Sequence, residues 1–203
     1  MISISEQQMF ATRGQRFMRW MQRILLLSGV LALSYVALIL IGAKLYQKYA
    51  LLSLDKQILA GEQHQAGDPR PAIKEGDVLG RIEIPRIGVS VAVLQGTTSQ
   101  TLRLGVGHIQ GTALPGEPGN IGIAGHRDTY FRGLKDIRRD DEIQIQTAIG
   151  LDKYKVDWVQ ITVPSDGSVL APTTESALTL VTCYPFYYIG AAPKRFVVHA
   201  HRL

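Results

Sequence analysis

Apolar residues follow two different patterns along the chain. Residues 24–43, ILLLSGVLALSYVALILIGA, form a stretch of 20 residues without a charge. A helix of that length measures about 30 Å, the thickness of the hydrocarbon core of a bilayer. From about residue 77 the apolar residues instead alternate with polar ones in short runs, which is typical of half-buried strands. We therefore expect one apolar helix followed by a β-rich domain.

Three roles are open to the apolar stretch. A buried core helix is one, but an apolar surface around the whole helix favours lipid over the core of a small domain. A cleaved signal peptide is another. Its apolar region is usually about 7–15 residues long and ends at a small-x-small site, which LIGAK matches poorly. Length and composition favour the third role, an uncleaved membrane anchor.

Basic residues are unevenly placed around this anchor. The net charge of the chain is +5, and four arginines against Glu6 leave +3 of it within residues 1–23. The positive-inside rule then places the N-terminus in the cytoplasm and the rest of the chain on the outer side of a cell membrane. The remaining residues are close to neutral and show no basic patch, so we expect no nucleic-acid partner.

Residues 44–76 connect the anchor to the β-rich part. Residues 44–60 keep helical spacing, and 61–77, GEQHQAGDPRPAIKEGD, combine glycine and proline with polar residues, as linkers do. The expected order is a cytoplasmic segment over 1–23, an anchor over 24–43, a stalk and linker over 44–76, and one domain over 77–203.

Short β-patterned runs fill the domain over 77–203. Glycine, proline and aspartate separate them, and little room remains for helix. The runs are LGRIEIPRIGVSVAVLQG, NIGIAGH, DEIQIQTA, DKYKVDWVQITVP, ALTLVTCY and RFVVHAHRL. This pattern predicts an all-β fold, either a closed or nearly closed barrel or a sandwich.

Cys183, in TLVTCYPF, is the single cysteine of the sequence. It cannot form an intramolecular disulfide, and multi-cysteine zinc or iron–sulfur sites are excluded. It is either a small buried apolar residue or a nucleophile. A nucleophilic thiol needs a basic or cationic neighbour that favours the thiolate. His126, beside Gly125 at the end of a strand, is one candidate partner, and His108, in GVGH, is its competitor.

Strand periodicity relates Cys183 to Arg195. Successive side chains of a strand point to opposite faces. If Leu180 lies in the core, Cys183 points away from it. Arg195 points outward if the alternate residues of the last strand face the core, which are Phe196, Val198 and Ala200. The two side chains can then meet, provided that their strands are neighbours.

These motifs together resemble the sortase family. TLVTC is followed by an arginine twelve residues later, with GNIGIAGHRD upstream, and the likeness covers residues 77–203. It implies an eight-stranded barrel with short helices or turns, and catalytic roles for His126, Cys183 and Arg195. Residues expected to touch the substrate are Thr182, Tyr184 and His108. The N-terminal anchor, the compact domain and the lack of a second apolar stretch resemble class D.

The resemblance also implies a function. Sortases are cysteine transpeptidases: the thiol attacks an LPxTG-like C-terminal sorting signal, forms a thioacyl intermediate and passes the protein to an amine. That amine is a cell-wall precursor or a protein lysine. Two alternatives remain: a cysteine peptidase that only hydrolyses, and an inactive membrane-anchored barrel that binds peptides.

Histidines near the end of the chain offer a different chemistry. His199 and His201 share one face of a strand, as a zinc pair would. The sequence spaces no carboxylate or further cysteine beside them, and we expect neither a metal nor a cofactor. Asp128 is a candidate for orienting His126, because carboxylates often hold an imidazole base.

Overall fold

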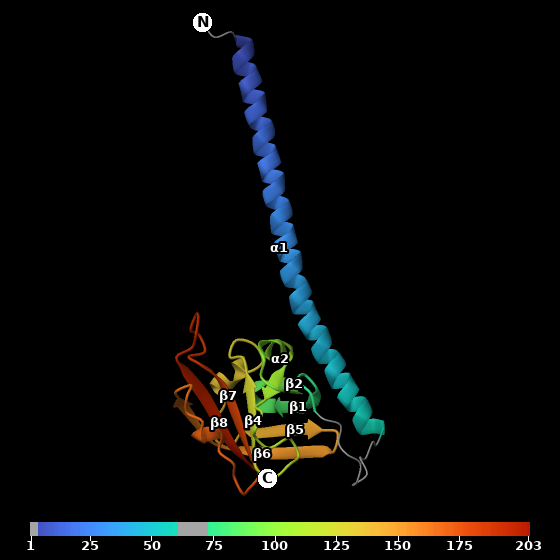
Figure 1. The fold of residues 1–203 in the computed structure, drawn as a ribbon, viewed down its shortest axis with the longest axis vertical. Helices are drawn as coiled ribbons and strands as arrows, with labels where there is room; N and C mark the ends of the chain where they lie inside the picture. The colour runs from blue at the N-terminus through green and yellow to red at the C-terminus, as the bar shows by residue number, and fades with distance from the viewer. Residues whose placement is uncertain (1–3, 61–72) are drawn as a thin grey trace. The chain divides into compact units, whose positions relative to one another are not determined.

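The computed structural model describes residues 4–60 and 73–203 (Figure 1). Most of the predicted linker, residues 61–72, lies outside the described residues. The chain divides into two compact units, Met1–Lys44 and Leu45–Leu203.

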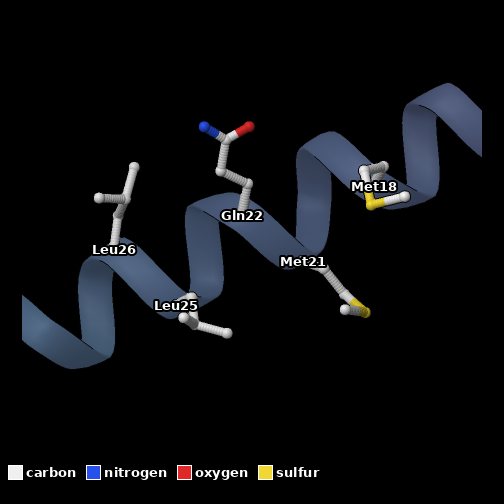
Figure 2. Close-up of a pocket in the computed structure, with 5 residues that line it drawn as sticks. All are labelled: Met18, Met21, Gln22, Leu25 and Leu26. Atoms are coloured by element: carbon white, nitrogen blue, oxygen red, sulfur yellow. The ribbon is translucent and has the colours of Figure 1, made fainter.

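Helix α1, Ile4–Ala60, carries the apolar stretch. Its segment Phe17–Ser53 is long and apolar enough to cross a membrane, and the predicted span over 24–43 lies inside it. Figure 2 shows a shallow pocket on this helix, lined by Met18, Met21, Gln22, Leu25 and Leu26. No other described element lines the pocket, and its side chains are mostly apolar. It holds none of the chemistry expected of the domain.

Eight strands close into a barrel in the order β1-β2-β3-β4-β7-β8-β6-β5. Closure excludes the sandwich and confirms the predicted eight-stranded fold. In chain order the elements are β1 (Val78–Ile84), η1 (Pro85–Ile87), β2 (Val89–Gln95), α2 (Ser99–Leu104), β3 (Val106–His108), β4 (Asn120–Gly125), η2 (Arg132–Asp136), β5 (Glu142–Thr147), β6 (Gly150–Thr162), η3 (Ser168–Leu170), β7 (Ala177–Tyr184) and β8 (Lys194–Arg202).

The barrel interior follows the alternation of the sequence. Most of its inward residues are at most 1% exposed, and a shift of one residue in register would turn them to the outer face. They include Ile82, Ile84, Val91, Val93, Ile121, Ile123, Ile143, Ile145, Leu178, Leu180, Val198 and Ala200.

Two strand pairs are parallel, whereas the others are antiparallel. β2 pairs with β3 in parallel, and β4 pairs with β7 in parallel. Parallel strands place their C-terminal ends at the same edge of a sheet. The ends of β4 and β7 therefore lie side by side, although β5 and β6 separate them in sequence (Figure 1).

The end of α1 belongs to the second compact unit. Ala50 is 1% exposed and packs with Ala92 and Leu94 on the outer face of β2. The change of pattern in the sequence predicts a domain over 77–203, and the compact unit that holds the barrel also includes the segment from Leu45. The physical reason is that β2 is apolar on both faces, so its outer face needs a cover.

Gln47 fastens this helical segment to the barrel. Its Oε1 accepts a hydrogen bond from the backbone N–H of Ala92 at 3.0 Å, and its Nε2 donates to the carbonyl of Leu104. Pairing between β2 and β3 starts only at Val93 and Val106. The side-chain amide thus takes the place of a missing backbone bridge between the two chain segments.

Candidate active site

Cys183 and Arg195 are cross-strand partners. β7 and β8 run antiparallel, and Cys183 lies directly opposite Arg195. Side chains opposite each other share a face, with Cβ atoms about 4.5–5.5 Å apart. Both residues are half-buried, and both lie on the strand face opposite the core residues Leu180 and Phe196. The condition that the sequence left open, that their strands are neighbours, is met.

His126 joins them from the end of β4. The last pair of the parallel ladder is Gly125 with Thr182, so the next residues along the two strands are His126 and Cys183. His126 is half-buried. A side chain at Gly125 would place its Cβ 2.6 Å from the ring of Phe131. Glycine therefore lets Phe131 pack against the strand end and turn the chain directly after His126.

Thr182 fixes the two strand ends to each other. Its Oγ1 donates to the carbonyl of Gly125 at 2.7 Å, and the residue is 2% exposed. Thr182, which precedes Cys183, is thereby bonded to Gly125, which precedes His126. Thr182 is predicted from the sequence to touch substrate, but its hydroxyl points into the protein and holds the strand ends that carry both catalytic candidates.

Thr179, the first threonine of TLVTC, holds a loop instead. Its Oγ1 donates to Asn120 Oδ1 at 2.8 Å, and Asn120 Nδ2 donates to the carbonyls of Val169 and Ala171 at 3.2 Å each. These bonds fasten the β6–β7 loop to the outer face of β4 and β7. No signal in the sequence indicates this role of Asn120, because its burial and its partners appear only in the folded chain.

Tyr184 packs directly after the cysteine. Its ring stacks on Phe196 with centroids 6.3 Å apart and meets Phe186 edge-on at 6.2 Å. All three rings contact the barrel core. Tyr184 is half-buried and remains a candidate for substrate contact beside Cys183.

His108 does not join this group. It is 2% exposed on β3, with Nδ1 2.9 Å from Gln95 Oε1 and Nε2 2.9 Å from the carbonyl of Ala113. Burial lowers the pKa of its ring below the ordinary value. Both ring nitrogens are occupied within the protein, so the structure offers neither to a thiol nor to a substrate.

Arg195 is held by the backbone of its own loop. Its Nη1 donates to the carbonyl of Lys194 at 3.1 Å and to that of Ala192 at 3.4 Å. Nε and Nη2 make no hydrogen bond to any residue that the structure describes. Asp128 is exposed, and among residues 73–203 no carboxylate is hydrogen-bonded to His126.

The histidine pair at the chain end has a carboxylate partner that sequence spacing did not reveal. Asp157 accepts from His199 Nδ1 at 3.1 Å and from His201 Nδ1 at 2.6 Å. Burial would raise the pKa of Asp157, but the hydrogen bonds from the two histidines outweigh it and lower the pKa. The described residues hold no group of three or more His, Cys, Asp or Glu arranged for a metal ion.

Comparison with known proteins identifies the family of the chain. The family model of the sortase domain matches residues 82–203. The chain belongs to the sortase family. Sortase D of Bacillus subtilis (strain 168) is 35% identical over 129 residues, which are 63% of this chain and 65% of that protein. The chain thus spans slightly less than two thirds of that sortase.

Solved sortase structures have the same fold. A Clostridium perfringens Sortase D5 transpeptidase matches at 30% identity and a TM-score of 0.66, over 78% of this chain and 98% of that one. Clostridium perfringens sortase C with the C-terminal cell wall sorting motif matches at 27% identity and a TM-score of 0.61, over 76% and 86% of the two chains. The two sortase D relatives confirm the expected class.

Proposed function

We propose that this sortase is a membrane-anchored cysteine transpeptidase with Cys183 as its nucleophile. The observation that carries the proposal is the meeting of Cys183, Arg195 and the strand end at His126 at one edge of the barrel. All three are half-buried, so a peptide can reach them. A buried structural cysteine would have neither a cationic cross-strand partner nor this exposure.

The reaction consists of two acyl transfers. His126 takes the thiol proton of Cys183, Sγ attacks the carbonyl carbon of a Thr–Gly or Thr–Ala bond, the C–N bond breaks, and His126 gives that proton to the leaving amine. The product is a thioester on the cysteine. An incoming amine then attacks the thioester, loses a proton to His126 and forms a new amide, while the C–S bond breaks and the thiol is restored.

Arg195 supplies the electrostatic part. Negative charge develops on the carbonyl oxygen in both steps, and fixed donors that face that oxygen lower the barrier. Nη1 of Arg195 is engaged by its own loop, which leaves Nε and Nη2 for the oxygen or for the substrate backbone. The guanidinium is thus held by one nitrogen and can donate with the other two.

The substrate we propose is a protein with an LPxTG-like C-terminal sorting signal. Support comes from the structural likeness to a sortase C solved with the C-terminal cell wall sorting motif. The acceptor is the amine of a cell-wall precursor or of a protein lysine. The apolar segment of α1 supports a single-pass anchor, with the N-terminus in the cytoplasm and the catalytic domain outside.

A direct test uses full-length protein in detergent and a panel of fluorogenic LPxTG-like peptides that end in Gly or Ala. Triglycine or a diamino acid serves as the amine. We expect cleavage, a Cys183 thioester detectable by intact mass, and a peptide–amine product. Cys183→Ala should abolish all three without loss of folding. Cleavage that persists in Cys183→Ala would refute the proposal. Cleavage that never yields the amine product would favour the hydrolytic peptidase, and binding without cleavage the inactive barrel.

A further inference from the structure

The loop over residues 185–193 connects the proposed nucleophile to the proposed oxyanion donor. It lies between β7, which carries Cys183, and β8, which carries Arg195. Two residues are enough to join antiparallel strands, so this loop is long for its task. Its tip is open to solvent: Tyr187 is 76% and Ile189 96% exposed. Side-chain packing at the tip therefore does not determine its conformation.

Arg127 holds this loop by its backbone. Its Nη2 donates to the carbonyl of Tyr188 at 2.7 Å and to that of Gly190 at 3.0 Å. Its Cζ also lies 5.9 Å from the centre of the Tyr188 ring, within range of a cation–π contact. Gly190 has a φ of +100°, a value that favours glycine. The chain turns there, and the carbonyls on either side of Ile189 converge on one nitrogen.

Arg195 holds the same loop further along the chain. Its Nη1 contacts the carbonyls of Ala192 and Lys194. The two guanidinium groups therefore bind successive alternate carbonyls of one segment, at 188 and 190 from Arg127 and at 192 and 194 from Arg195. A change in the loop at residues 188–190 would be passed on to the carbonyls that orient Arg195.

Position and hydrogen bonding both indicate more than a stabilising role for Arg127. It is the residue directly after His126, so its backbone is fixed by the same strand end. Its Nη1 is buried and has no hydrogen-bond partner among the described residues. A buried N–H without a partner lowers stability. The stability of the barrel alone therefore does not explain why Arg127 occupies this position.

We propose that Arg127 is a positioning residue, which holds loop 185–193 so that the Arg195 guanidinium stays at the level of Cys183. This inference rests on the proposed function of the site. Arg127 touches neither substrate nor thiol in this role; it acts through the loop on Arg195. It couples the strand end at His126 to the other two catalytic candidates.

The experiment is a double-mutant cycle on full-length protein, with the panel peptide that is cleaved best. Arg127→Lys keeps the charge but loses the fork of donors that reaches both carbonyls. We expect kcat/KM to fall about tenfold, mostly through kcat, which is the effect of one lost charged hydrogen bond. Labelling of Cys183 by a small electrophile and the melting temperature should stay unchanged. In an Arg195→Ala background the same substitution should cost less than about twofold, since the residue it positions is gone.

A substitute background, a hydrogen-exchange measurement and a control variant complete the cycle. Arg195→Lys replaces Arg195→Ala if the latter is too slow to assay. Hydrogen exchange should become faster in Arg127→Lys at the amides of residues 186–194 and stay the same in η2. Arg132→Lys, an exposed residue on η2, is the matched control and should change nothing.

Three results would overturn the inference: an equal loss in both backgrounds, no loss in the Arg127 variant, or a loss without faster exchange in the loop. Failure of the proposed function itself looks different, because activity would then survive Cys183→Ala. Activity that depends on Cys183 but does not change on substitution of Arg127 would contradict only the positioning role of Arg127.

Discussion

The two parallel strand pairs of the barrel end in similar residues, but one end is buried and the other carries the candidate active site. β2 and β3 end at Gln95 and His108, which are register partners. β4 and β7 end at Gly125 and Tyr184, and His126 and Cys183 are the next residues along the two strands after the last pair. In each case a parallel join brings a histidine and a polar or nucleophilic residue to one edge. Topology therefore creates two comparable strand ends.

Burial makes the difference between them. The chain after His108 folds back so that Ala113 and Thr112 meet the ring, and Gln95 takes the other nitrogen. The chain after His126 turns away around Phe131 and leaves the imidazole half-exposed. A strand-end histidine is thus available for chemistry only where the following loop leaves its nitrogens unoccupied.

The strongest test of this comparison exchanges the two histidines for alanine. His126→Ala should lower kcat/KM by about 10²–10⁴, the contribution of one general acid–base group, with little change in melting temperature. His108→Ala should retain activity within a few-fold but lose about 1–3 kcal/mol of stability, because Gln95 keeps no partner. Steady-state kinetics and thermal unfolding measure both. The opposite pattern would show that the buried histidine is the catalytic one.

Substitution of Arg195 is expected to have the next largest effect, because this cation lies directly opposite Cys183. Arg195→Ala and Arg195→Lys should each lower kcat/KM by at least about a hundredfold, since removal of one oxyanion donor costs about 10²–10³ in rate. Lysine lacks the planar fork of donors. Electrophile labelling of Cys183 and the melting temperature should be unchanged. Near-normal turnover by Arg195→Lys would reduce the arginine to a general positive charge.

Gln47 offers a stability test on the β2–β3 side. Gln47→Leu keeps the size of the side chain but leaves the N–H of Ala92 and the carbonyl of Leu104 without a bond. We expect the melting temperature to fall by a few degrees, because an unpaired buried group costs about 1–3 kcal/mol. Activity at low temperature should persist. Gln100→Leu, at an exposed position of α2, is the control, and an equal drop there would remove the role assigned to Gln47.

The smallest expected effect is a pH dependence from His108. Burial lowers the pKa of its ring, so below about pH 6.5 the unfolded chain binds a proton that the folded chain resists. The free energy of unfolding therefore decreases as the pH falls below the pKa of His108 in the unfolded chain. The decrease stops once the pH reaches the lower pKa of His108 in the folded chain. Denaturant unfolding from pH 8 to pH 5 should therefore show a shallower decline in His108→Gln than in the natural chain. Parallel curves would show that the ring does not titrate in this way.

Sequence alone predicted the faces of the strands that carry the site. Alternation around Leu180 and Phe196 placed Cys183 and Arg195 on one surface, because a strand has a period of two residues. The eight-stranded barrel and the likeness to class D were implied by the resemblance of the motifs to sortases. Only the structure shows that β7 and β8 are neighbours, which brings the two side chains together.

Contacts between distant segments could not be predicted in this way. Asn120 meets Thr179, and Arg127 meets Tyr188, across about sixty residues each, and no local period relates them. The packing of Ala50 against Ala92 and Leu94 on the outer face of β2 likewise joins segments far apart in sequence. The compact unit that contains the barrel therefore also includes the helical segment from Leu45.

The crossover between β4 and β7 also sets when the site can form during folding. β5 and β6 must be synthesised before β7 can lie beside β4, and contacts of such long sequence separation form slowly because the closure of a long loop costs chain entropy. His126 and Cys183 are consequently apart in any partly folded chain in which β4 and β7 are not yet paired. The thiol meets its proposed partner only once these two strands pair, so enzymatic activity itself reports that this long-range pairing has formed.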